Sequence, residues 1–309
     1  MHIKIGTRGS KLALWQAYFV EKQLQKMGIS TSIVEISTKG DKILDVSLAK
    51  IGSKGLFTEE LEEMLRNGTI DIAVHSAKDV QSTLADDLEL IAFTEREEAN
   101  DVLVALRPVD LNSLVGKIAI GTSSTRRSAF LRHYYPHLQI VDMRGNLQTR
   151  FEKLKNGACD AMILAFAGVH RLNFDNFIVQ KLPFDNFTPP VGQGCIGVEC
   201  SRLLDEDLKN LVIKAINHSP TAQCIRIERD FLKTMQGGCS VPTFGYANYA
   251  NANEIDFRAG IISLDGSKIV REFAQFPLIE AEHAGEAMAK KVLAMGGKEI
   301  LETIKKTQQ

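Results

Sequence analysis

Cys239 is the first residue whose position could serve chemistry. It follows Gly237 and Gly238 at the end of a helical pattern, in the stretch FLKTMQGGCSVPTFG. The glycines suit a helix C-cap, where the backbone needs a left-handed residue, and Pro242 prevents the helix from resuming. We therefore expect the thiol at the tip of a loop. A free cysteine is most often a small buried filler, so this position alone leaves both a structural and a nucleophilic role open.

Asp79 is the second candidate, in the stretch HSAKDV. It follows Lys78 at the end of an apolar strand pattern, where an aspartate can simply form a turn. At a site that binds acids, an extra carboxylate opposes binding, so it needs a purpose such as proton transfer or stabilisation of a cationic intermediate. HSAKDV is the only obvious place for such a carboxylate. His75 is expected to be structural, because an imidazole beside several arginines resists taking up a positive charge.

Basic residues and hydroxyls gather at the starts of expected helices. They lie in GTRGS, GTSSTRR, MRGNLQTR and AGVHRL, and LAKIGSKGLF adds lysines on a glycine-rich loop. A helix start favours an anion, although each hydroxyl could be an ordinary N-cap and each arginine a solvated charge. Arg forms fork-shaped pairs with carboxylate or phosphate, at roughly 1.5–3 kcal/mol for each charge-assisted bond, so the set predicts a ligand with several negative groups. The residues are Arg8, Ser10, Lys50, Lys54, Thr122, Ser123, Ser124, Arg126, Arg127, Arg144, Arg150 and Arg171.

Two α/β units are expected to position these residues. From Ile3 to about Thr94, strands at IKIG, SIVEIST and DIAVHSA alternate with a helix that stops at Gly28 and a helix at FTEELEEMLRNG, with Thr58 as its N-cap. This order predicts a parallel sheet with ligands beyond the carboxyl ends of its strands, where Asp79 lies. The scheme then repeats, with strands at VLVAL, KIAIG, QIVDM and DAMILAF and helices at TRRSAFLRHYY and LQTRFEKLKNG.

The remaining chain predicts a return and a third unit. The segment FTPPVGQGCIGVEC is expected to carry the chain back to the first unit, with Cys195 packed on the return strand. A helix from Thr221 to Met235, three strands (TFGYANYA, IDFRAGIIS and KIVREFAQF) and a terminal helix then predict a small antiparallel sheet with helices on one face. The predicted fold class is α/β with a third, α+β domain. The predicted domains are 1–96 together with 194–216, 97–193, and 217–309.

Composition narrows the class of protein. The 309 residues include 44% hydrophobic and 24% charged residues, as in ordinary globular proteins, and no long apolar run that would span a membrane. A formal charge of -1 gives no general basic field for nucleic acid. Five cysteines without a CxxC pair suit neither a disulfide framework nor a zinc site. Because the N-terminus shows no export signal, we expect a soluble cytoplasmic protein. Because the cysteine spacing suits no zinc site, we also expect no bound metal.

Seven of the quoted stretches together resemble the porphobilinogen deaminase (hydroxymethylbilane synthase) family across essentially the whole chain. They are GTRGSKLALWQA, LAKIGSKGLFTEELE, DIAVHSAKDV, GTSSTRR, MRGNLQTR, VGQGCIGVEC and GGCSVP. The resemblance implies a monomer of three domains, the first two arranged like a type II periplasmic binding protein. It also implies stepwise deamination and condensation of four porphobilinogen molecules into hydroxymethylbilane, a linear tetrapyrrole of heme biosynthesis. Uroporphyrinogen-III synthase would take up this product.

The resemblance also implies roles for individual residues. Cys239 matches the cysteine that holds a dipyrromethane cofactor through a thioether, and this cofactor primes the polymerisation. Asp79 matches the catalytic aspartate, which stabilises positive charge on the pyrrole rings and assists proton movements, while Lys54 and Phe57 match a lid over the substrate. Cofactor and substrate contacts fall on Arg8, Ser10, Lys78, Thr122, Ser124, Arg126, Arg127, Arg144, Arg150 and Arg171, with Gln16, Lys50 and Gln193 as secondary candidates.

Four departures from the family pattern and two other functions complete the predictions. Gly9 and Lys11 stand where Gln and Pro are usual in the family, Ser53 stands in place of Gly, and Gln81 in place of Pro. Ser53 puts the mobility of the lid loop in question.

A pure anion receptor built from two lobes and a hinge is the main alternative function, and it predicts reversible binding without chemistry. A nucleic-acid binder is disfavoured, because the basic residues sit at corners and form no stripe with interleaved aromatics.

Overall fold

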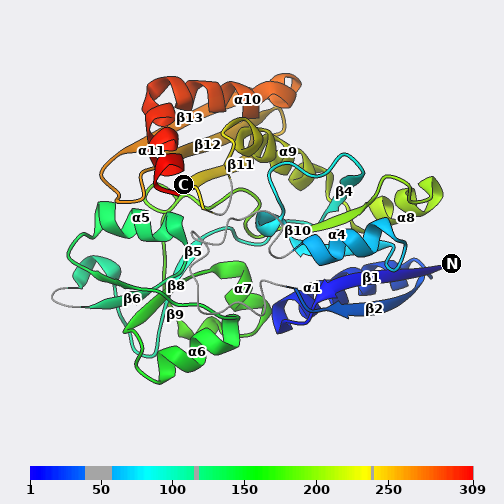
Figure 1. Cartoon of the computed structure of the whole chain (residues 1–309), viewed down its shortest axis with the longest axis horizontal. Coiled ribbons are helices and arrows are strands. Elements are labelled where there is room, and N and C mark those ends of the chain that lie inside the picture. The colour runs from blue at the N-terminus through cyan, green and yellow to red at the C-terminus, as the bar shows by residue number, and fades with distance from the viewer. Residues whose placement is uncertain (39–57, 115–117, 238–239, 309) are drawn as a thin grey trace.

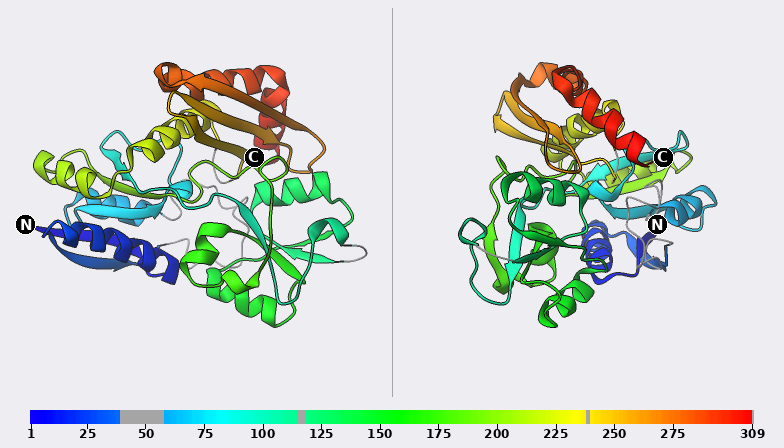
Figure 2. Two further views of the ribbon diagram at one scale, coloured as in Figure 1. Left: turned by 180° about the vertical axis from the view of Figure 1, so that it is seen from behind. Right: turned by 60° about the vertical axis from the view of Figure 1, so that its left-hand side comes forward.

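The computed structural model describes residues 1–38, 58–114, 118–237 and 240–308, and it contains three sheets. Two open α/β units lie side by side, and the third, antiparallel sheet packs above them with the C-terminal helices (Figures 1 and 2). The predicted fold class is confirmed. Within the described part of the chain, no helix has both the length and the apolar character needed to cross a bilayer.

The first sheet has the strand order β2-β1-β3-β10-β4. Its strands are β1 (His2–Arg8), β2 (Ser30–Ile36), β3 (Ile72–Ser76), β4 (Leu88–Phe93) and β10 (Ile196–Ser201). The strands β1, β2 and β3 are parallel as expected, but β10 runs antiparallel to both β3 and β4, so the sheet is mixed. Its core packs against α1 (Lys11–Lys26), α4 (Glu59–Arg66) and α8 (Glu206–Ile216).

The second sheet repeats this plan in the order β7-β6-β8-β5-β9. Its strands are β5 (Asp101–Ala105), β6 (Ala119–Gly121), β7 (Gln139–Val141), β8 (Ala161–Ala165) and β9 (Ile178–Lys181), and its helices are α5 (Thr125–Tyr134), α6 (Leu147–Lys155) and α7 (Phe166–Arg171). Again three strands are parallel, and β5 runs antiparallel to β8 and β9. The elements β4, β9, α7 and α8 were not predicted from the sequence.

The third unit is an antiparallel sheet in the order β11-β12-β13. It comprises α9 (Ser219–Thr234), β11 (Thr243–Asn251), β12 (Glu254–Ile262), β13 (Ile269–Pro277), α10 (Ala281–Val292), a π-helical turn (Leu293–Gly297) and α11 (Lys298–Gln308). The expected terminal helix is thus two helices, because Gly296 adopts a positive φ of 110° between them. Short 3₁₀ helices occupy Ala77–Asp79, Leu111–Ser113, Asp175–Phe177 and Leu278–Glu280.

The end of α9 differs from the expected glycine cap. The left-handed residue there is Gln236, with φ 49°, and Gly237 is not left-handed. Gly237 leaves little room for a side chain, since a Cβ at this position would lie 2.7 Å from Leu232 Cδ1 and the leucine side chain would have to shift. Gly238 and Cys239 lie outside the described residues, so the expected loop tip is not tested.

A buried ion pair joins the three units. Arg96, where the chain leaves the first sheet, donates two hydrogen bonds to Glu228 of α9, at 2.7 and 2.8 Å. Glu228 also accepts from the backbone N–H of Gly192, in the returning segment, and of Ala247, in β11, both at 2.8 Å. Glu228 is fully buried, so these donors compensate its loss of hydration. The two crossings between the α/β units are therefore fixed to the third unit.

Candidate active site

Asp79 lies at the carboxyl end of β3, in a tight 3₁₀ turn. The Ala77 N–H donates to the Cys195 carbonyl at 2.9 Å, which fastens this turn to the chain entering β10. Gly192 makes the close approach possible: its φ is 78°, and a Cβ there would lie 2.8 Å from the Ala77 carbonyl carbon. The backbone around Asp79 is therefore tightly constrained.

A small cavity of about 60 Å³ opens beside Asp79. The residues that line this cavity come from several elements and include Arg8, Ser10, Gln16, Thr58, His75 and Asp79. Gln16 donates to Ser76 Oγ at 2.8 Å, which ties α1 to the end of β3. Ser10 is the N-cap of α1, and its hydroxyl accepts from the Ala13 N–H. Of the two roles predicted for these hydroxyls, anion contact and helix capping, Ser10 therefore shows the second. Within the described residues, no hydrogen-bond donor is bonded to the Asp79 carboxylate.

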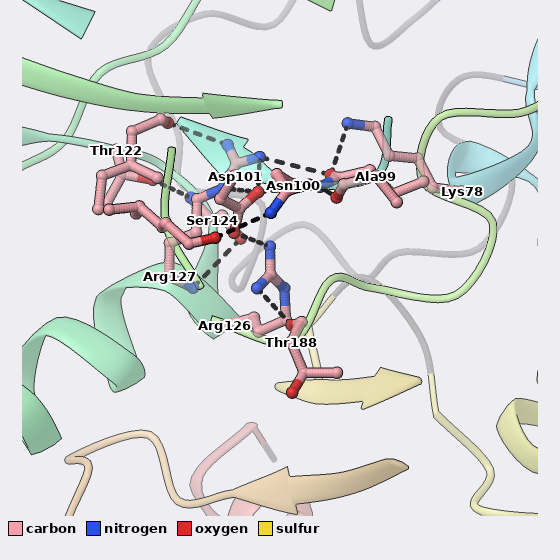
Figure 3. Close-up of polar contacts among 12 residues, drawn as sticks. Lys78, Ala99, Asn100, Asp101, Thr122, Ser124, Arg126, Arg127 and Thr188 are labelled. Carbon is pink, nitrogen blue, oxygen red and sulfur yellow. Dashed lines mark hydrogen bonds and ion pairs between the residues drawn. The ribbon is translucent and has the colours of Figure 1, made fainter. Parts of the chain in front are cut away.

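The second lobe carries a buried cluster of two arginines around Asp101 (Figure 3). Arg126 donates to one oxygen of this carboxylate at 2.6 Å, and Arg127 donates to the other at 2.7 and 3.1 Å. Burial opposes ionisation of Asp101, but the two guanidiniums outweigh it and hold the pKa of this carboxyl well below its usual range. The expectation that HSAKDV was the only place for a carboxylate among the basic residues was therefore wrong.

Lys78 and Gln193 extend this cluster toward the first lobe. Gln193 donates to Asp101 Oδ1 at 2.9 Å and to the Ala99 carbonyl at 2.7 Å, and its own oxygen accepts from Lys78 Nζ at 3.4 Å. Burial, together with the charge of Arg127, lowers the pKa of Lys78 to about 8. This amine therefore loses its charge only a little above neutral pH.

The hydroxyls of Thr122, Ser123 and Ser124 make hydrogen bonds close to the start of α5. Ser124 is the N-cap of α5 and accepts from the Arg127 N–H, while Thr122 Oγ1 accepts from the Ser124 N–H at 3.3 Å. Ser123 donates to the Met143 carbonyl at 3.1 Å. These bonds satisfy the first turn of α5 and hold Arg126 and Arg127 toward Asp101.

Arg144 and Arg150 form a further basic group at the start of α6. Arg150 donates from Nε to the Gly145 carbonyl at 2.8 Å. Burial, then the nearby charges of Arg127 and Arg144, lower its pKa to about 10, and Asp79 is among the groups that oppose this shift. Arg144 is buried and has one terminal nitrogen without a hydrogen-bond partner in the described part of the chain. The two lobes therefore direct cations and the Asp79 carboxylate toward one region.

Arg171 lies at the contact between α1 and α7. Its guanidinium Cζ is 5.3 Å from the ring centroid of Trp15, and it donates to the Gly194 carbonyl at 2.8 Å. Burial lowers the pKa of this guanidinium. Arg171 thus joins α7 to Trp15 of α1 and to the Gly194 carbonyl in the returning segment.

Of two expectations about nearby residues, the packing of Cys195 is confirmed, and the structural role of His75 stays a prediction. Cys195 is buried, and burial raises the pKa of its thiol to about 12, as befits a packed cysteine. His75 is also buried, with Nε2 3.0 Å from Glu199 Oε2, although the pair lacks the alignment of a hydrogen bond. Four predicted site residues lie outside the described residues: Lys50, Lys54, Phe57 and Cys239.

Two residues that order this site, Asp101 and Glu62, were not predicted from the sequence. Asp101 directly precedes the apolar strand VLVAL, and a carboxylate at the edge of a fully buried strand was an available signal. Thr58 occupies the N-cap position of α4 as expected, but its side chain makes no capping bond. It donates instead to the Glu62 carboxylate at 2.6 Å. Nothing in a single sequence indicated that contact.

Two family models match most of the chain. The model described as "Porphobilinogen deaminase, dipyromethane cofactor binding domain" matches residues 3–210, and "Porphobilinogen deaminase, C-terminal domain" matches residues 222–294. The chain belongs to the porphobilinogen deaminase family. It is a transferase, a hydroxymethylbilane synthase of tetrapyrrole biosynthesis, which confirms the function and enzyme class predicted from the sequence.

Full-length relatives agree with this assignment. The porphobilinogen deaminase of Cytophaga hutchinsonii is 50% identical over 304 residues, covering 98% of this chain and 97% of the relative. That of Desulfosudis oleivorans is 48% identical and covers 100% and 99%. Among solved structures, the methionine binding protein MetQ covers 69% of this chain and 89% of its own, with a TM-score of 0.45 and 12% identity. That similarity is too low to add to the assignment.

Proposed function

We propose that Asp79 is the catalytic carboxylate of this hydroxymethylbilane synthase and that the basic residues of both lobes hold the acidic arms of the pyrroles. One observation carries the assignment. In the described residues, the Asp79 carboxylate has no bonded donor and faces a cavity that it shares with Arg8. A carboxylate in that position can accept pyrrole N–H groups, stabilise positive charge on the rings and move a proton.

The basic residues keep an excess of positive charge despite their internal pairing. Arg126, Arg127 and Lys78 surround the single carboxylate of Asp101, which leaves a net charge of two when the lysine is protonated. Burying an unpaired carboxylate costs several kcal/mol, so acetate and propionate arms need such partners. The unpartnered nitrogen of Arg144 offers a further donor. Arg8, Ser10, Gln16, Thr122, Ser124, Arg150, Arg171 and Gln193 complete the proposed set, with Lys50 as a further member.

A dipyrromethane cofactor fits this charge distribution, and we propose that it is attached through a thioether to Cys239. When bound, it supplies the free pyrrole end onto which four porphobilinogen units are condensed. Lys54 and Phe57 would cover the substrate. The domain limits proposed are 1–96 with 194–216, 97–193, and 217–309. We further propose a cytoplasmic monomer whose product passes to uroporphyrinogen-III synthase.

Mass measurement and one substitution test these assignments. The intact protein should exceed its sequence mass by one dipyrromethane, Cys239→Ser should lack this increment, and porphobilinogen should add further units stepwise. Asp79→Asn should remain folded and carry the cofactor, with turnover reduced about 10²–10⁴-fold. An active protein without an adduct would exclude the tether, and near-normal turnover by Asp79→Asn would exclude the carboxylate. Reversible binding without covalent mass would favour the anion-receptor alternative.

A further inference from the structure

Gln81 joins the Asp79 turn to the start of α4. It lies two residues after Asp79, and its Nε2 donates to Glu62 Oε1 at 3.1 Å and to Thr58 Oγ1 at 3.4 Å. Thr58 donates to the same oxygen of Glu62 at 2.6 Å. Thr58 and Glu62 are both buried at the start of α4. The three side chains therefore form a closed hydrogen-bonded group between α4 and the catalytic turn.

This group is continuous with the cavity beside Asp79. Thr58 lines that cavity together with Asp79, and its hydroxyl also accepts from Gln81, so one residue contributes both to the lining and to the bonds that hold Gln81. Arg66, one turn after Glu62, lies 3.6 Å from its second carboxylate oxygen. Each oxygen of Glu62 thus has a donor or a cation nearby, which favours a single orientation for the Gln81 amide.

The backbone of Gln81 is anchored to the third unit. Arg229 of α9 donates from one terminal nitrogen to the Gln81 carbonyl at 2.7 Å. Its guanidinium is buried, which lowers its pKa, and the charges of Glu199 and Asp230 oppose this shift. Two residues after Asp79, the side chain is thus fixed to α4 and the main chain to α9. A shift of either helix would be transmitted to the carboxylate.

We propose that Gln81 is a positioning residue, which keeps the Asp79 carboxylate directed at its cavity by joining the turn to Thr58 and Glu62. The inference depends on the catalytic role proposed for Asp79. Misplacement of a reacting group by about 1 Å can cost on the order of 10²-fold in rate. A residue that merely stabilised the fold would leave turnover by the folded protein unchanged. Gln81 is also one of the departures from the family pattern, and a proline there would have no amide to donate.

The first test compares Gln81→Leu with Gln275→Leu in cofactor-loaded, full-length protein. Gln275 donates to Asp256 Oδ1 at 3.0 Å, so it matches the glutamine-to-carboxylate bond in a place far from the site. Gln81→Leu should lower kcat for porphobilinogen consumption about tenfold, with KM changed less than about twofold. Gln275→Leu should keep wild-type kcat. If Gln81→Leu does not fold, Gln81→Asn, whose amide falls one methylene short, replaces it with the same expectation.

The second test uses the pH dependence of Gln81→Glu. This substitution sets a carboxyl group against Glu62, with Arg66 on α4 and Arg229 on α9 as the facing cations and Asp79 two residues away. At low pH the two carboxyls can share a proton and restore the bond, whereas at higher pH they repel. The ratio of its kcat to the wild-type value should therefore rise as pH falls, over a range in which circular dichroism shows both proteins folded.

The outcomes separate this inference from the proposed function. The positioning role would be overturned by a wild-type kcat in Gln81→Leu, or by an equal loss of kcat in Gln275→Leu. In either case, an inactive Asp79→Asn would leave the proposed function standing. A raised KM with unchanged kcat would also overturn it. An active Asp79→Asn would remove the proposed function and, with it, the reason for positioning Asp79. A tenfold loss confined to kcat, partly restored in Gln81→Glu at low pH, would support the inference.

Discussion

Replacing Asp101 with asparagine tests the electrostatic organisation of the basic lobe. The change keeps the shape of the side chain and removes its charge. It also replaces one acceptor oxygen with an NH₂ group, which cannot accept from Arg126 or Arg127. At present the carboxylate accepts from both guanidiniums and from Gln193, and it is fully buried. Asparagine would leave two buried cations without a counter-charge.

The expected loss of stability follows from this burial. Removing one partner of a buried ion pair costs about 3–5 kcal/mol. At roughly 2–4 °C for each kcal/mol, the thermal midpoint should fall by about 10 °C. The matched control is Asp185→Asn, because Asp185 pairs with Arg258 at 2.9 Å but its side chain is 85% exposed. An exposed pair contributes about 0.2–1 kcal/mol, so that midpoint should hardly move.

Thermal unfolding followed by circular dichroism at several pH values provides the assay. The pKa of Asp101 is lowered on folding from an ordinary 3.8, so its contribution is fully present above about pH 4 and is lost as pH falls below that value. The difference between wild type and Asp101→Asn should therefore be constant near neutral pH and shrink under acid conditions. A midpoint that moves no further than in Asp185→Asn would refute the claim that Asp101 compensates both arginines.

Three further predictions concern single groups. Because the pKa of Lys78 is lowered to about 8, kcat/KM for porphobilinogen should fall as pH rises through that value, and Lys78→Arg should remove this step from the pH profile. Cys195, with a pKa raised to about 12 by burial, should resist alkylation at pH 8 in the native protein and react after denaturation, as peptide mass spectrometry would detect. Arg171→Ala should red-shift the emission of Trp15, the sole tryptophan, because removing the side chain exposes to water the ring that the guanidinium covers; an unchanged spectrum would contradict that contact.

Local sequence signals predicted the fold where periodicity and caps agree. The helix α1 begins at a Ser N-cap and ends before Gly28, and both signals are present in the chain. The helix α7 was missed for a physical reason: it follows β8 directly, and its N-cap Ala165 makes no capping bond. For α8 the signals existed, since Asp205 caps the helix and acids fill its first turn. The antiparallel direction of β10 depends on tertiary pairing, which no local pattern encodes.

The site was predictable in its residue types but not in its pairing. Strand ends and helix starts indicated where Asp79, Arg126 and Arg127 would lie, because the carboxyl ends of neighbouring strands meet at one edge of a sheet. The partner of the arginines comes from the start of β5, and in the sheet β8 lies between β5 and β6, the strand that precedes α5. Long-range contacts of this kind depend on topology. For the same reason, the bond between Gln81 and Glu62 appeared only once α4 and the catalytic turn were placed together.

Two aspartates with the same chemistry acquire different roles from their surroundings. Asp101 has every hydrogen bond its carboxylate needs and no exposed surface, so it stays ionised and serves to order cations. Asp79 lies in a constrained turn beside a cavity, with no bonded donor in the described residues. A substrate that brings pyrrole N–H groups could satisfy the second carboxylate and not the first. Under the proposed function, this asymmetry allows one site to hold acidic arms through its arginines while keeping a carboxylate available for chemistry.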